Sequence, residues 1–68
     1  MNRKVLLRLV GLYGNAFSLL AAFRQAARRQ GWTSDEIQRV TDEATRADYD
    51  HLLSVLIEHT EEPDTDVD

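Results

Sequence analysis

Residues 32–37 read WTSDEI, and this stretch contains the clearest helix start in the chain. Thr33 is a good N-cap, and Glu36, three positions later, completes a capping box in which each side chain accepts a hydrogen bond from the other residue's backbone N–H. Trp32 and Ile37 flank the box as a hydrophobic staple, which favours a structural role for Trp32 over recognition. We predict a helix from residue 34 to about residue 45, with a narrow apolar stripe of Ile37, Val40 and Ala44.

The residues before this stretch predict a first helix over residues 16–30. Asn15 is a good N-cap, the run that follows contains no Gly or Pro, and Gly31 stands where a left-handed residue commonly ends a helix. At about 100° per residue, one face of this helix is apolar and points to the core. That face consists of Ala16, Leu19, Leu20, Phe23, Ala26 and Ala27.

The residues after the second helix predict a third one, which begins at the N-cap Asp48 and continues to about His59. Its apolar side chains cover more than half of its circumference: Tyr49, Leu52, Leu53, Val55, Leu56 and Ile57. Two small neighbouring helices do not normally bury so wide an arc. We therefore expect either the N-terminal segment or a second subunit to cover it.

Residues 3–10, RKVLLRLV, fit two patterns, because their alternation favours a strand while Leu6, Leu9 and Val10 also fit a short helix. We favour extended structure, which in a helical chain would stay hydrated or pair across a dimer. The predicted fold class is all-α or mostly α: one three-helix domain in residues 1–60, preceded by this short segment. Residues 61–68, EEPDTDVD, form an acidic tail that we expect to be disordered.

Charge is divided unevenly along the chain. The net charge is −4, yet residues 1–30 contain six basic side chains and no acid, whereas residues 31–68 contain all twelve acids and two arginines. This asymmetry indicates a charged partner or a dipolar self-association, unless the two halves simply attract each other within one fold. Asp35–Arg39 and Asp42–Arg46 have the acid-first spacing that favours ion pairs along the second helix.

The composition excludes several classes of protein. Without cysteine, the chain has no disulfide and no thiolate nucleophile or metal ligand. Its apolar runs are far shorter than the ~20 residues of a membrane span. The start, MNRKVLLRLVGLYG, resembles a signal peptide, but Arg8 interrupts the apolar run and no small-residue cleavage site follows. We expect a cytoplasmic protein with no membrane partner.

Two motifs have both a functional and a structural interpretation. Gly11 and Gly14 precede Asn15, and free N–H groups at a helix start can bind an anion. The turn lacks the features of a P-loop or a dinucleotide fingerprint, so we interpret it as a helix start.

A set of acids and histidines at the third helix lacks zinc-site spacing and fits capping and solvation better. These residues are Asp48, Asp50, His51, Glu58 and His59. We predict no catalytic residue, no metal site and no cofactor.

Two candidate partner-binding surfaces remain. Phe17, Arg24 and Arg28 share a flank of the first helix, and an aromatic followed by arginines is a pattern that stacks bases and holds phosphates. Alternatively, Phe17 lies under the N-terminal segment with the arginines extended over it. A pI of about 5.0 argues against general nucleic-acid binding. The second surface is the acidic face of the second and third helices, with Asp42, Glu43, Asp50 and His51.

Three stretches in this order, LVGLYGNAF, GWTSDEI and DYDHLL, resemble a group of short uncharacterised proteins of bacterial phages, prophages and plasmids. The resemblance spans roughly residues 8–59. Tyr13 stands where the group's pattern, G-x-D-G-N-A-F, has an acid, which puts in doubt any activity that depends on that acid. The resemblance implies a mobile-element origin and no known activity.

We therefore expect a small, non-enzymatic interaction module that binds a host protein and modulates or inhibits it, for example one in a defence or nucleic-acid-handling complex. The alternative is a nucleic-acid-associated regulator that uses the basic half. We also expect a homodimer with Leu52, Val55, Leu56 and residues of the N-terminal segment near its interface. The alternative is a monomer whose N-terminal segment folds back across the third helix.

Overall fold

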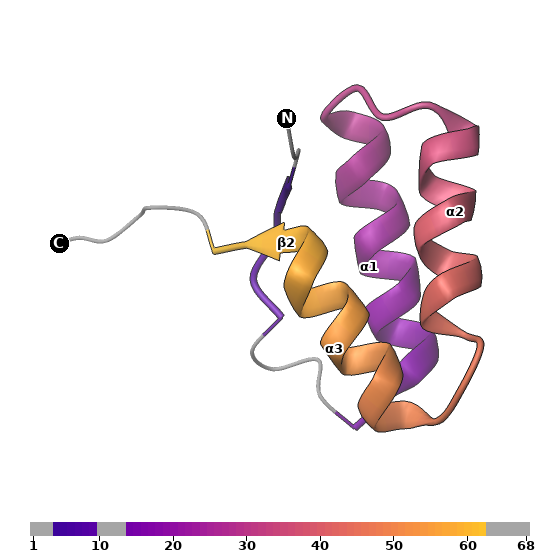
Figure 1. Ribbon diagram of the computed structural model, residues 1–68. Helices are drawn as coiled ribbons and strands as arrows, with labels where there is room; N and C mark the ends of the chain where they lie inside the picture. Colours follow the sequence, from indigo (N-terminus) through magenta and orange to yellow (C-terminus); the bar gives the residue numbers. More distant parts are fainter. Residues whose placement is uncertain (1–3, 10–13, 63–68) are drawn as a thin grey trace, which may run out of the picture.

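The computed structural model describes residues 4–9 and 14–62, in which three helices and two short strands form (Figure 1). The helices are α1 (Ala16–Arg29), α2 (Ser34–Ala44) and α3 (Tyr49–His59). The strands are β1 (Val5–Leu6) and β2 (Thr60–Glu61). The predicted three-helix class is confirmed. No helix in these ranges is long and apolar enough to cross a membrane.

All three helices begin as their N-cap residues predict. The side-chain oxygen of Asn15 accepts from the Ser18 N–H at 3.1 Å, and that of Asp48 accepts from the His51 N–H at 3.0 Å. The capping box at Thr33 is complete in both directions. α1 and α2 end one residue earlier than predicted, and Gly31 after α1 has the expected positive φ of 91°.

The glycine turn before α1 is held to α3. Gly14 has a φ of 98°, and its N–H donates to the Tyr49 hydroxyl at 2.6 Å. Since Asn15 already takes the Ser18 N–H, two of the donors that an anion would need at this turn are engaged within the chain. The turn starts a helix and anchors it; Gly11 lies outside the described residues.

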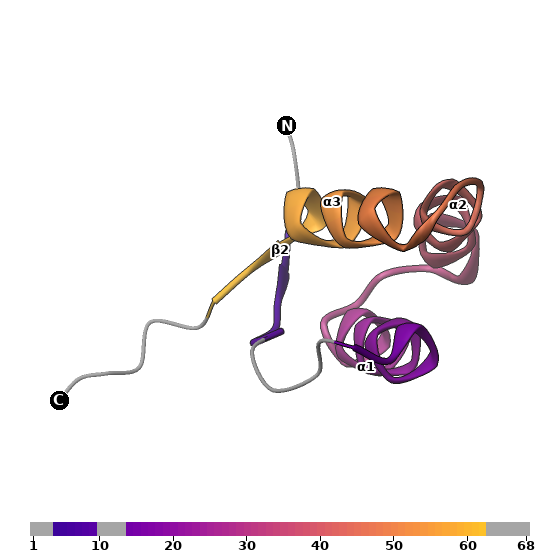
Figure 2. The ribbon, with the colours of Figure 1, turned by 90° about the horizontal axis from the view of Figure 1, so that it is seen from below.

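The core lies inside a four-sided arrangement. In a view roughly along α1 and α2, with α3 lying crosswise, the three helices follow one another around the core, and the N-terminal segment closes the fourth side between α3 and α1 (Figure 2). The largest fully buried side chains come from three of the sides: Phe23, Leu19, Leu56 and Val5. Phe23 meets the edge of the Trp32 ring, with the ring centroids 5.8 Å apart. Ile37 belongs to this core, and Trp32 is half-buried and packs against it.

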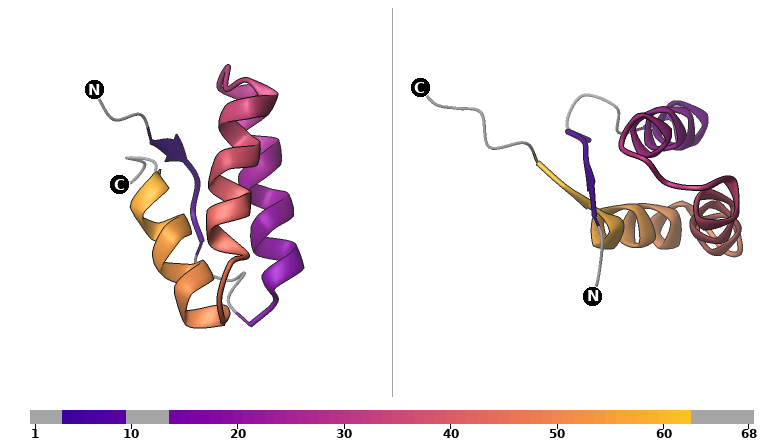
Figure 3. Two further views of the ribbon diagram at one scale, coloured as in Figure 1. Left: turned by 45° about the vertical axis from the view of Figure 1, so that its right-hand side comes forward. Right: turned by 90° about the horizontal axis from the view of Figure 1, so that it is seen from above.

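The N-terminal segment is extended, as favoured from the sequence, but the expectation about its pairing is wrong. β1 pairs in parallel with β2, with Val5 opposite Thr60 and Leu6 opposite Glu61, so the strand's partner is the short strand that follows α3 in the same chain (Figure 3). The Leu7 N–H donates to the Glu61 carbonyl oxygen at 3.0 Å. Glu61 was predicted to open the tail and instead belongs to the sheet; residues 63–68 lie outside the described residues.

A side-chain amide occupies the other edge of β1. The Leu6 N–H donates to Gln30 Oε1 at 2.9 Å, and Gln30 Nε2 donates to the Leu6 carbonyl oxygen at 2.9 Å. The Gln30 amide therefore pairs with β1 as a neighbouring peptide group would. Because Gln30 is also the C-cap of α1, this pair of bonds fastens the segment to the end of that helix.

Gln30→Glu is expected to destabilise the fold in a pH-dependent way. The introduced carboxylate keeps an acceptor for the Leu6 N–H but places its second oxygen against the Leu6 carbonyl. Because Gln30 is exposed, the cost is about 0.5–1.5 kcal/mol at pH 7. This contact raises the pKa of the carboxyl in the folded state, so the penalty holds above that pKa and fades towards about pH 4, where the carboxyl donates again.

The measurement is urea denaturation of the wild type, Gln30→Glu and Gln30→Ala at pH 7 and pH 4. Gln30→Ala loses both bonds and is the matched control, because its difference from the wild type should not change with pH. If the Gln30→Glu difference is equally large at both pH values, the amide pairing with Leu6 is not what stabilises the segment.

The predicted dimer interface is wrong in its residues. Leu52, Val55 and Leu56 are all buried within the single chain. Val5 and Leu9 of the N-terminal segment join the same core, so these three side chains of α3 are buried within one chain and need no second subunit to cover them. Ile57 alone among the large apolar side chains of α3 is exposed, at 52%.

Candidate binding surfaces

The first candidate surface lies on α1 and consists of Phe17, Ala21, Arg24 and Arg28, hereafter the α1 surface. Phe17 is 84% exposed, so it is not covered by the N-terminal segment. Ala21, Arg24 and Arg28 are also exposed. They follow at intervals of three and four residues and share one flank of the helix over about 16 Å.

The charge of the α1 surface is not neutralised by the rest of the fold. The helix contains no acidic residue, and its last turn carries Arg28 and Arg29. Within the described part of the chain, the guanidinium groups of Arg24, Arg28 and Arg29 make no hydrogen bond or ion pair. These arginines therefore bind none of the acidic side chains in the described part of residues 31–68. The α1 surface combines an exposed aromatic side chain with cations that have no partner among the described residues.

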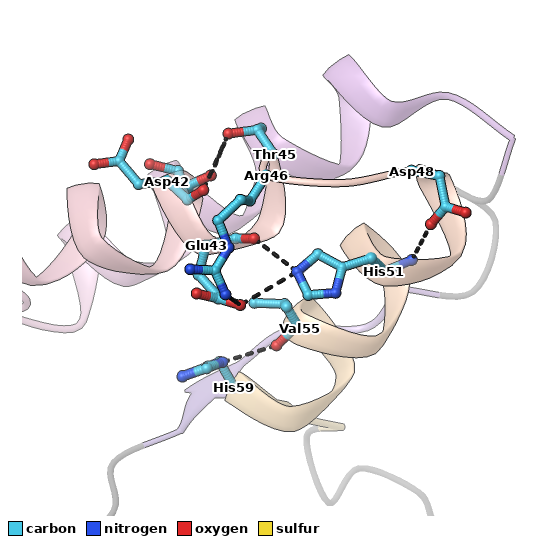
Figure 4. Close-up of polar contacts among 9 residues, drawn as sticks. Asp42, Glu43, Thr45, Arg46, Asp48, His51, Val55 and His59 are labelled. Carbon is cyan, nitrogen blue, oxygen red and sulfur yellow. Dashed lines mark hydrogen bonds and ion pairs between the residues drawn. The ribbon is translucent and has the colours of Figure 1, made fainter.

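The second candidate surface lies where α2 meets α3 (Figure 4). Glu43 Oε2 lies 2.8 Å from Arg46 Nη2 and 3.2 Å from His51 Nε2. The same His51 nitrogen lies 2.9 Å from the Glu43 carbonyl oxygen. Because a carbonyl oxygen only accepts, we assign the ring hydrogen of neutral His51 to Nε2. The predicted Asp42–Arg46 pair is replaced by Glu43–Arg46, and Asp42 instead accepts from Gln38 Nε2 at 2.8 Å.

This junction is built as a structural joint. His51 links the first turn of α3 to the last turn of α2, and His59 is turned back onto its own helix, with Nδ1 2.8 Å from the Val55 carbonyl oxygen. Residues 4–9 and 14–62 contain no group of three side chains that could hold a metal ion. Of the four residues predicted on this surface, Glu43 and His51 contact each other, whereas Asp42 and Asp50 stand exposed on different helices.

A third feature was missed by the sequence reasoning. Ile57 was assigned to the buried arc, yet it points outward on the flank of α3 that also carries Ser54 and Asp50, three and seven residues earlier, both exposed. The signal was available: Leu52, Val55 and Leu56 define the buried side, and Ile57 lies about 145° around the helix from their mean direction.

The three surfaces differ in their chemistry. The α1 surface is apolar and cationic, the flank of α3 is apolar and anionic, and the α2–α3 junction is internally paired. Comparisons of this chain with protein-family models, with curated proteins and with solved structures gave no match.

Proposed function

We propose that this chain is a non-enzymatic protein-interaction module, which binds another protein molecule through the α1 surface. The observation that carries the proposal is the 84% exposure of Phe17. Burying a phenylalanine side chain stabilises a complex by about 1.5–3 kcal/mol, and aromatic side chains are common anchors at the centres of interfaces.

The flanking arginines define the chemistry of the partner. Arg24 and Arg28 are exposed and unpaired within the described residues, so a partner that presents carboxylates around an apolar site would complement them. A protein fits this description better than a nucleic acid, because the chain has a net charge of −4 and long-range repulsion opposes its approach to phosphates.

The proposal is tested by photo-crosslinking in the cells that produce the protein. A photoreactive phenylalanine analogue replaces either Phe17 or Gln38, which is exposed on α2. We expect position 17 to give a discrete protein adduct and position 38 to give none. Equal adducts at both positions, or adducts to nucleic acid alone, would overturn the proposal.

Charge reversal separates the α1 surface from general electrostatics. Arg24→Glu and Arg29→Glu change the net charge equally, both sites are exposed on α1, and only Arg24 lies on the flank of Phe17. We expect Arg24→Glu to reduce the crosslinking yield at position 17 at least fivefold and Arg29→Glu to leave it within twofold. Equal losses would show that net charge alone governs the association.

A further inference from the structure

We propose that the protein molecule bound by the α1 surface is a second copy of this chain, docked through the exposed flank of α3 formed by Asp50, Ser54 and Ile57, hereafter the α3 surface. This inference rests on the proposed function and names its partner. Phe17 and Ile57 are two of the three large apolar side chains exposed in the described part of the chain, the third being Leu6 in β1.

The two surfaces match in spacing. Phe17 and Arg24 are seven residues apart on α1, and Asp50 and Ile57 are seven residues apart on α3. Seven residues correspond to about 10 Å and nearly two full turns, so each pair shares one side of its helix. The order of apolar and charged residue is reversed between the helices. Antiparallel packing of α1 on α3 of another copy therefore sets Phe17 against Ile57 and Arg24 against Asp50 in a single register.

The two surfaces also match in charge and size. The charged side chains of the α1 surface are both cationic, whereas the α3 surface carries the anionic Asp50. Glu58 is exposed next to the α3 surface. The Asp50 carboxylate, like Arg24, has no hydrogen-bond or ion-pair partner in the described residues. The middle of each surface is a small side chain, Ala21 on one and Ser54 on the other. Small residues at the crossing permit an interaxial distance of about 8 Å, at the near end of the usual range.

The contact is heterologous, because it joins two different surfaces. When the α1 surface of one copy docks on the α3 surface of another, the first copy still has a free α3 surface and the second a free α1 surface. Further copies can therefore add unless a ring closes. A single pair of helices buries little area, which makes the contact weak and strongly dependent on concentration and salt. This arrangement differs from the symmetric interface at Leu52, Val55 and Leu56, whose side chains are buried in the core.

The test is complementation between two variants, measured by sedimentation velocity from about 10 µM to 1 mM. Phe17→Asp removes the α1 surface and keeps the α3 surface, whereas Ile57→Asp does the reverse; both sites are exposed, so circular dichroism should show the wild-type fold. We expect the wild-type average mass to rise with concentration and to fall on addition of salt. Each variant alone should stay monomeric, and their equimolar mixture should form a species of twice the monomer mass that grows no further.

Gln38→Asp is the matched control, because it places the same new carboxylate at an exposed position of α2, away from both surfaces, and should associate like the wild type within twofold. A wild type that remains monomeric at 1 mM overturns the inference. So does a mixture that remains monomeric while the wild type associates. If the wild type remains monomeric at 1 mM but position 17 still crosslinks to a different protein, the proposed function stands and only the identity of the partner is wrong.

Discussion

Val55→Asp is expected to abolish cooperative folding. Val55 is buried between α3 and the rest of the core, and an aspartate there loses its hydration without gaining a partner. An uncompensated buried charge costs about 3–5 kcal/mol. A domain of this size has a total stability of roughly 3–10 kcal/mol, so the variant should show little or no sigmoidal transition in thermal unfolding followed by circular dichroism.

Ile57→Asp is the control for this prediction. It introduces the same group two residues later on the same helix, but at a position that is 52% exposed. Its free energy of unfolding should stay within about 1 kcal/mol of the wild type. If both variants unfold to the same extent, helix propensity rather than burial determines the loss, and the described core at Val55 is wrong.

Phe23→Ala is expected to have the second-largest effect, a loss of about 3–5 kcal/mol through the removed contacts and the cavity left behind. Phe23 is fully buried and meets the edge of the Trp32 ring. The variant should therefore unfold at much lower denaturant concentration and also show changed near-ultraviolet circular dichroism from Trp32.

Phe17→Ala is the matched control, since it makes the same substitution six residues earlier on the same helix. Because Phe17 is 84% exposed, its removal should change stability by no more than about 0.5 kcal/mol. A comparable loss in both variants would mean that Phe17 packs on the fold, and the α1 surface would then have no apolar anchor.

The local parts of this fold were predictable because their causes lie within a few residues. Asn15, Thr33 and Asp48 each cap a helix through a backbone N–H three positions later, so the sequence contains both partners of each bond. The same holds for the buried stripes of α1 and α2, whose helical spacing is visible in the chain.

The fourth side of the core was not predictable in the same way. The pairing of Val5 with Thr60 and of Leu6 with Gln30 joins residues far apart in sequence, and neither strand is longer than two residues. Without these contacts, α3 appeared to need an external partner, and this led to the wrong dimer interface. Only the tertiary arrangement shows that the chain covers Leu52 itself.

The candidate surfaces were predicted unevenly for the same reason. Phe17, Arg24 and Arg28 share a flank by helical spacing alone, and the structure leaves them exposed. The choice between Asp42 and Glu43 as the partner of Arg46 depends on side-chain conformation at the end of α2, which spacing does not determine.

The parallel pairing of β1 with β2 has a consequence for the order of folding. Val5 and Thr60 are 55 positions apart, so their contact closes a loop that contains nearly the whole chain, whereas each helix and the α2–α3 joint close over much shorter distances. Loop-closure entropy delays the most distant contacts, so we expect the helices to form early and the two strands to meet last. The same contacts involve few backbone hydrogen bonds, and we expect them to open first in native-state fluctuations. A brief release of β1 would withdraw Val5 from the core and leave β2 unpaired, so exchange of that strand between copies is a route to misassembly at high concentration.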